Sequence, residues 1–142
     1  MKYIQNGEEK NISFETADFS TMIEKSNPLY TYGVIFCEKT QEISVSYKAP
    51  KWYQLLAAIH EYLCQIEDAC GDEYHCKESE ERVLETIDEI DWKQLGVNLS
   101  KEEIKQSYIE ARVKMFEACI GVQADDKLKI KMSHALEFLR QL

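Results

Sequence analysis

Residues 42–64, EISVSYKAPKWYQLLAAIHEYLC, contain the change of hydrophobic period that decides the fold. In the first six residues apolar and polar side chains alternate, which is typical of a strand with one buried face. Pro50 suits the first turn of a helix. From there apolar residues recur at spacings of three and four, at Trp52, Leu55, Leu56, Ile59, Leu63 and Ile66. The stretch therefore predicts a strand followed by an amphipathic helix.

The chain before this stretch is predicted to be mainly β. An Asn6-Gly7 turn signal within residues 2–13 indicates a hairpin. Residues 29–37 and 42–47 are rich in β-branched and aromatic side chains and are joined by a polar turn, which predicts a second hairpin. Between the hairpins, Asp18 is expected to cap a short helix that ends at residue 24 or 25.

The chain after Pro50 is predicted to be helical. The first helix runs to about residue 68, and a second starts at residue 74 or 75. Ser100 and Glu103 form a capping box for a third helix, and residue 125 or 126 caps the last. We expect a single α+β domain over residues 1–142, mainly β over 1–48 and mainly α over 50–142. In it, N-terminal β-hairpins precede a four-helix antiparallel bundle-like half.

Composition excludes several classes of protein. The 142 residues are 44% hydrophobic with a net charge of −9, and no apolar run approaches the roughly 20 residues of a membrane span. The N-terminal residues lack the apolar stretch of a signal peptide, and five cysteines are an odd number. These features predict a soluble, cytoplasmic protein that binds neither membranes nor nucleic acid.

Most of the negative charge lies in residues 61–91, which hold twelve acidic and two basic side chains. The simplest interpretation of such a run is a solvated helical face and its connecting loop. Cation binding and an acidic surface that docks on a partner protein are the two functional alternatives. The same segment also contains three cysteines and His75, and His60 directly precedes it.

One cluster of side chains in this region predicts a metal site. His60 and Cys64 are four residues apart and share a helical face, as do Cys76 and Glu80 on the next helix. Antiparallel packing of the two helices would place Cys76 beside Cys64. Imidazole, thiolate and carboxylate are the ligands that zinc prefers, so the four residues are candidate zinc ligands.

Three further residues belong to this hypothesis. Glu61 is the candidate catalytic residue, as a general base, and Cys70 or His75 are possible substitute ligands. In the alternative without metal, the cysteines are reduced core residues and His60 is a buried histidine with a satisfied hydrogen bond.

Residues 46–64 resemble the layout of zinc metallopeptidases, in which a strand precedes a helix carrying HExxH. Cys64 stands where that motif has its second histidine, and a thiolate ligand lowers the Lewis acidity of the metal. Residues 50–120 are also similar to small uncharacterised proteins of prophages and mobile elements. The shared motifs are HExxC, CxxxE at Cys76, and YxxxR at Tyr108 with Phe116.

Three functions remain open at this stage. The first is an acidic interaction protein of a phage or mobile element, docking on or inhibiting a host protein and holding a structural metal. The second is a zinc-dependent hydrolase with an HExxC site. The third is a scaffold or oligomer without a chemical site. Arg112, four residues after Tyr108, is expected to form a structural salt bridge with Glu80 or Glu81.

Overall fold

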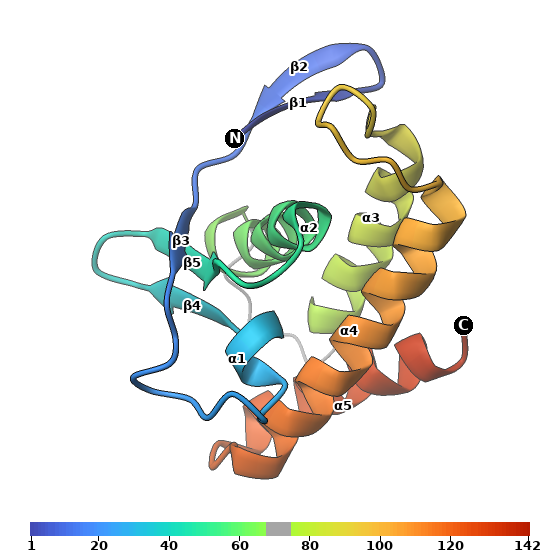
Figure 1. The fold of residues 1–142 in the computed structure, drawn as a ribbon. Helices are drawn as coiled ribbons and strands as arrows, with labels where there is room; N and C mark the ends of the chain where they lie inside the picture. The colour runs from blue at the N-terminus through green and yellow to red at the C-terminus, as the bar shows by residue number, and fades with distance from the viewer. Residues whose placement is uncertain (68–74) are drawn as a thin grey trace.

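The computed structural model describes residues 1–67 and 75–142, and of His75 the backbone alone. Two small sheets come first and helices follow, so the predicted α+β class is confirmed (Figure 1). The strands are β1 (Lys2–Gln5), β2 (Glu8–Asn11), β3 (Glu15–Ala17), β4 (Val34–Cys37) and β5 (Glu42–Ser46). The helices are α1 (Leu29–Tyr32), α2 (Lys51–Tyr62), π-helical η1 (Leu63–Glu67), α3 (His75–Glu89), α4 (Lys101–Val122) and α5 (Asp126–Arg140).

The first predicted hairpin is confirmed as the antiparallel pair β1–β2. Asn6 and Gly7 take φ angles of 52° and 78°, the left-handed conformation that Asn-Gly turns between two strands require. Two backbone hydrogen bonds join the hairpin to the C-terminal end of α3 and to the chain just after it. The Asn6 amide donates to the Glu89 carbonyl and the Asp91 amide donates to the Ile4 carbonyl, each at 2.9 Å.

The second sheet has the order β3-β5-β4. Its antiparallel β4–β5 pair confirms the second predicted hairpin, although β4 begins later than expected. The parallel pairing of β3 with β5 was not predicted. A three-residue strand of sequence ETA shows no alternation, so it carries no periodic signal.

Two local predictions between the hairpins are wrong. The first part of the predicted strand 29–37 is the short helix α1, because Pro28 takes a helical φ and Asn27 Oδ1 accepts a hydrogen bond from the Leu29 amide at 3.0 Å. The helix expected after Asp18 is a series of turns. There the carboxylate of Asp18 accepts from the Ser20 amide at 2.9 Å, a local turn contact that competes with a helix.

The predicted starts of the long helices are confirmed. The Ser100 hydroxyl accepts a hydrogen bond from the Glu103 amide at 3.1 Å at the start of α4, and the Asp125 carboxylate caps α5. The helix that follows Pro50 extends through the π-helical turn η1 to Glu67.

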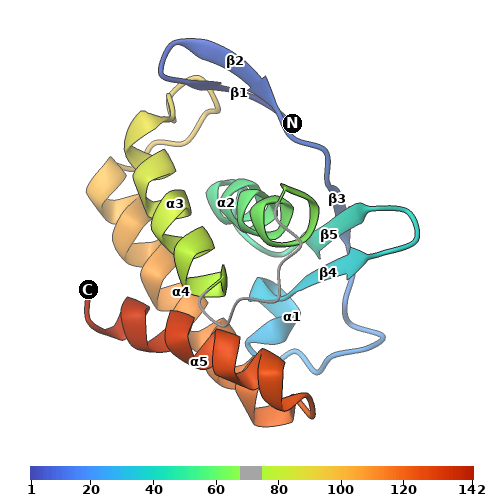
Figure 2. The ribbon, with the colours of Figure 1, turned by 180° about the vertical axis from the view of Figure 1, so that it is seen from behind.

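Helix α2 lies at the centre of the molecule, between the β3-β5-β4 sheet and the other long helices (Figures 1 and 2). Five of its side chains are fully buried: Tyr53, Leu55, Leu56, Ala57 and Ala58. In Figure 1, α2 is seen nearly end-on, whereas α3 and α4 lie close to the plane of the picture, so α2 crosses both helices steeply. Helix α5 packs across α3 and α4. Because α2 is enclosed on several sides, polar side chains on its inner face are forced to find partners within the protein.

Candidate metal centre

His60 and Cys64 form the first half of the candidate site. They lie one helical turn apart, on the last turn of α2 and in η1, and both side chains are buried. Cys64 Sγ lies 3.3 Å from His60 Nε2. Tetrahedral zinc with ordinary bond lengths separates a sulfur and a nitrogen ligand by about 3.6 Å, so the observed distance is close to that of two ligands of one ion.

Cys76 completes a group of three potential ligands. It lies on the first turn of α3, and its sulfur, Cys64 Sγ and a ring nitrogen of His60 all lie within 4.8 Å of one another. The expected approach of Cys76 to Cys64 is therefore confirmed. Within residues 1–67 and 75–142 this is the group of histidine, cysteine and acidic side chains whose spacing could hold a metal ion.

Glu80, the fourth candidate ligand, lies on the other side of the imidazole ring. Its Oε1 is 2.5 Å from His60 Nδ1, whereas Cys64 is next to Nε2. The carboxylate is within ion-pair distance of Nδ1 but is poorly aligned for a hydrogen bond from it. The structure thus gathers His60, Cys64 and Cys76 around one point and places Glu80 behind the histidine, where carboxylates commonly orient metal-binding imidazoles.

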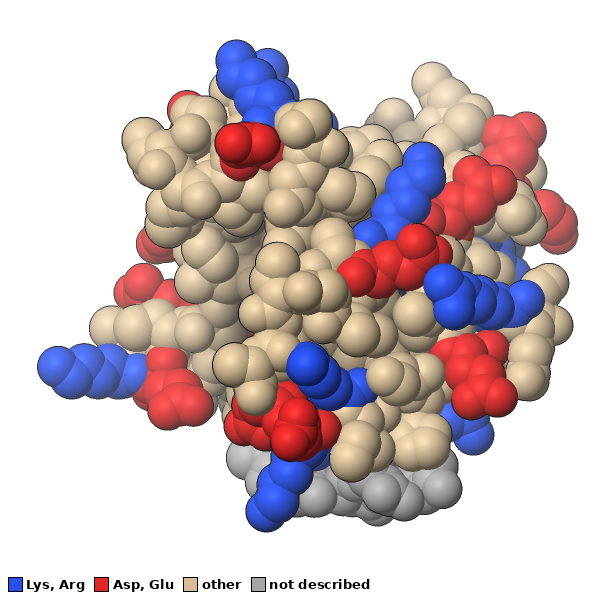
Figure 3. All heavy atoms as spheres, turned by 90° about the horizontal axis from the view of Figure 1, so that it is seen from below, with Lys and Arg blue, Asp and Glu red and all other residues tan. Residues whose placement is uncertain are grey.

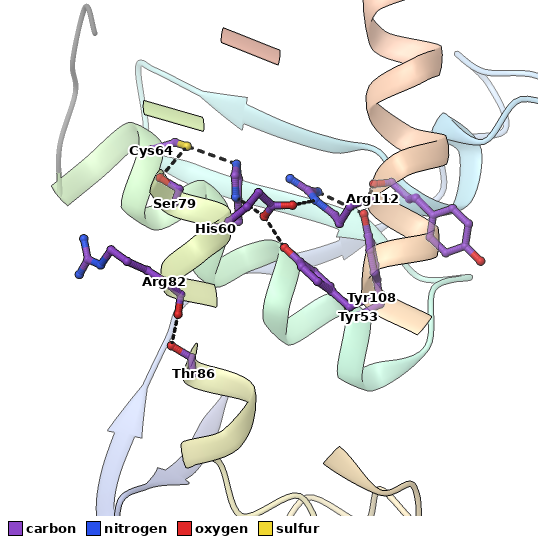
Figure 4. A network of polar contacts seen from close by, with 10 residues as sticks. Tyr53, His60, Cys64, Ser79, Arg82, Thr86, Tyr108 and Arg112 are labelled. Carbon is purple, nitrogen blue, oxygen red and sulfur yellow. Dashed lines mark hydrogen bonds and ion pairs between the residues drawn. The ribbon is translucent and has the colours of Figure 1, made fainter. Parts of the chain in front are cut away.

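Tyr108 and Arg112 hold the Glu80 carboxylate in place, and Tyr53 in turn contacts Arg112. Figure 4 labels these three residues together with His60. Tyr108 donates its hydroxyl to Oε1 at 2.5 Å, and Arg112 Nε donates to Oε2 at 3.0 Å. Arg112 also donates from Nη1 to the Tyr53 hydroxyl at 3.2 Å. The predicted salt bridge of Arg112 is therefore confirmed with Glu80 as its partner.

The charges of the buried row formed by His60, Glu80 and Arg112 explain the pKa values of its members. Burial raises the pKa of Glu80, but the charges of Arg112 and His60 and the hydrogen bond from Tyr108 outweigh burial and lower it to about 2. Burial lowers the pKa of His60, but the Glu80 carboxylate opposes it and raises the pKa to about 9. Without a metal, the two residues form a buried ion pair.

The two thiols have opposite tendencies. A hydrogen bond from Cys64, helped by His60 and opposed by burial, lowers the pKa of Cys76 to about 4. The same hydrogen bond and burial raise the pKa of Cys64. Cys64 also contacts the buried hydroxyl of Ser79 at 3.3 Å. A thiolate on Cys76 next to a cationic His60 is the environment of an activated nucleophile, and a metal ion bound here would replace the proton of His60.

All three potential ligands face a cavity of about 480 Å³. Glu61, the predicted general base, also lines this cavity, and burial raises the pKa of its carboxyl group. The volume is within the range of small-molecule sites. The structure therefore places the candidate catalytic carboxylate and the candidate ligands at one hollow.

Some predicted participants cannot be placed. Cys70 lies outside the described residues, as does the side chain of His75. Ser79 and Tyr53 were missed from the sequence. Neither residue belongs to a sequence motif. Tyr53 contacts Arg112, 59 positions away, and Ser79 contacts Cys64, 15 positions away, so no local spacing indicates either contact.

The acidic segment 61–91 is only partly described, since Asp68, Asp72 and Glu73 lie outside the described residues. Glu80 is buried, and several of the remaining acids have partners, among them Glu67 with Arg82, Glu81 with Lys77, Asp88 with Lys105, and Glu89 with Gln5. On the face shown in Figure 3, acidic and basic side chains are interspersed. Docking of a partner protein on this segment stays a prediction.

Comparison with protein-family models, curated proteins and solved structures gives no match. The similarity to prophage proteins accordingly stays a prediction. No helix within the described residues is both long and apolar enough to cross a membrane.

Proposed function

We propose that this protein is a zinc-dependent hydrolase in which His60, Cys64 and Cys76 hold the metal. One observation carries the proposal: three close-set ligand atoms and the carboxylate-bearing Glu61 line the same cavity. Three protein ligands with a fourth position open to a cavity is the arrangement of catalytic zinc sites, whereas structural sites are closed by four protein ligands.

The chemistry of the donor atoms supports zinc. Two sulfurs and an imidazole nitrogen suit zinc better than calcium, magnesium or manganese, which prefer oxygen ligands. The contact of Glu80 with His60 Nδ1 leaves Nε2 for the metal, and Ser79 is close to Cys64 Sγ. Both are the kind of outer contacts that orient metal ligands in proteins.

Glu61 is the residue to which we assign the proton transfer. When bound, zinc acts as a Lewis acid toward a substrate carbonyl and an attacking water. The Glu61 carboxylate would take the proton of that water and return it to the leaving group. Burial raises the pKa of this carboxyl group above its usual range, which brings it closer to neutral pH and so favours both transfers.

The proposal is tested by separating metal binding from turnover. Zinc-loaded protein is assayed with p-nitrophenyl hexanoate, a general esterase probe. We expect Glu61→Gln to keep its zinc and to lower zinc-dependent hydrolysis by roughly 10²–10⁴-fold. Glu38→Gln, in an exposed turn, is the matched control and should retain the wild-type rate. Equal rates for both variants and the wild type would overturn the role of Glu61.

A second candidate function uses the same atoms without metal. Cys76, His60 and Glu80 form a thiol–imidazole–carboxylate row, which is the arrangement of a cysteine nucleophile with its base and the group that orients the base. Iodoacetamide distinguishes the two functions. A zinc site predicts slow alkylation of Cys76 that a chelator accelerates, and a thiol nucleophile predicts fast alkylation that a chelator leaves unchanged.

A further inference from the structure

The side chains that line the cavity beside the three potential ligands indicate what kind of molecule it binds. The ligand group lies where the end of α2 meets η1 and α3, and the walls come from other parts of the chain. One wall is formed by residues before and within α1 and β4, and the other by α4 and α5. The apolar side chains of the walls include Phe19, Leu29, Val34, Met115, Phe116 and Met132.

Several of these wall residues are nearly inaccessible to water. Phe19 is 1% exposed, Phe116 3% and Met132 7%. Charged side chains outside the ligand group also line the cavity: Glu61, which lies beside the metal ligands in sequence, Arg112, which is bound to Glu80 and Tyr53, and Lys131 on α5. The cavity thus has a polar end at the ligand group and a mainly apolar remainder, which also includes the charged Lys131.

We propose that the cavity takes an acyl compound, with its carbonyl at the metal and a hydrocarbon chain of several carbons along the apolar walls. This inference rests on the proposed zinc function. A volume of about 480 Å³ has room for more than an acetyl group, and an apolar wall rewards each methylene group removed from water by roughly a fourfold gain in affinity. The selective ligand is therefore a medium-chain acyl ester, amide or acid derivative.

Hydroxamic acids test this inference, because they place an acyl chain behind a zinc-binding head group. Zinc-loaded protein is titrated by calorimetry with acetohydroxamic and with octanohydroxamic acid. We expect the octanoyl compound to bind at least about tenfold more tightly. Zinc-free protein is the blank and should bind both compounds much more weakly.

Two substitutions on α5 give a matched pair for the same titration. Leu128 lines the cavity and is 37% exposed, whereas Ile130 is 45% exposed and is not among the residues that line it. Leu128→Glu should remove most of the preference for the octanoyl chain, and Ile130→Glu should keep it. If Leu128→Glu fails to fold, Ile35→Glu replaces it, because Ile35 lines the opposite wall and is 40% exposed.

The outcomes separate this inference from the proposed function. Equal binding of the two hydroxamates to zinc-loaded protein would overturn the acyl-chain site and leave the zinc site standing. Failure of zinc-loaded protein to bind either compound would overturn the open metal position, and the inference with it. Octanoyl binding that is as strong without zinc would overturn the placement of the carbonyl at the metal.

Discussion

Glu80 is a fully buried carboxylate, and its surroundings explain why it is tolerated. Desolvation of an isolated charge is costly, but Arg112, Tyr108 and His60 surround both oxygens. The side chains come from three different helices, so the same contacts that satisfy the charge also join α2, α3 and α4. Removal of Glu80 leaves the charged groups of Arg112 and His60 buried without their counter-charge.

We predict that Glu80→Gln destabilises the protein by roughly 3–5 kcal/mol, because Arg112 loses its buried counter-charge. The measurement is urea denaturation at neutral pH. Glu81→Gln is the matched control, since Glu81 pairs with Lys77 at the surface and that pair is worth less than about 1 kcal/mol. A loss for Glu80→Gln no larger than that of the control would contradict the account of this row.

The His60–Glu80 pair also predicts a pH dependence of the metal-free protein. The pKa of His60 rises from 6.5 to about 9 on folding, so its contribution is complete below pH 6.5 and is lost as the pH rises through about 9. The pKa of Glu80 falls from 4.5 to about 2, so its contribution is present above pH 4.5 and is lost as the pH falls toward 2.

Denaturation of chelator-treated protein between pH 6.5 and about 9 measures this effect. We expect the wild type to lose more stability over this range than His60→Gln, whose side chain does not titrate. Parallel curves for the two proteins would show that His60 is neutral in the metal-free fold.

At the scale of elements, the candidate centre links η1 to the first turn of α3. These two elements supply Cys64 and Cys76, and the chain between them includes residues 68–74. A ligand that binds across two elements of the folded state and not the unfolded chain stabilises the fold by mass action. Metal binding should therefore be visible as thermal stability.

We predict that zinc at about a thousandfold excess over its Kd raises the Tm by roughly 10 °C, since such an excess is worth about 4 kcal/mol. Thermal unfolding with and without zinc measures the shift. Cys76→Ser should abolish it, and Cys37→Ser should preserve it, because Cys37 is an exposed residue at the end of β4. A shift of the same size in Cys76→Ser would exclude Cys76 as a ligand.

The elements themselves were predictable to the extent that their signals are local. The Asn6-Gly7 turn and the Ser100 cap act through neighbours in the chain, and both were found. The strand β3 depends on a distant partner, β5, and its sequence has no period of its own. Residues 29–32 have strand-forming side chains, but Pro28 and Asn27 start a helical turn that overrides this propensity.

At the scale of the whole molecule, the sequence predicted which residues of the candidate metal centre lie close together. It did not predict on which side of the His60 ring each of them lies. Helical spacing placed His60 with Cys64 and Cys76 with Glu80. The expected approach of Cys76 to Cys64 is found, although α2 crosses α3 steeply and does not pack antiparallel to it. Spacing does not tell which side of the imidazole a neighbour occupies, so Glu80 was counted among the ligands although it lies at Nδ1. The cavity is built from segments far apart in the chain, which no local pattern reveals.

The central claim is that His60, Cys64 and Cys76 bind one zinc ion. Elemental analysis of protein purified without chelators or a histidine tag tests it most directly. We predict one zinc per chain in the wild type and in Cys37→Ser, and a loss of zinc in Cys64→Ser and Cys76→Ser. Wild-type protein without zinc, or cysteine variants that retain the full amount, would contradict the claim.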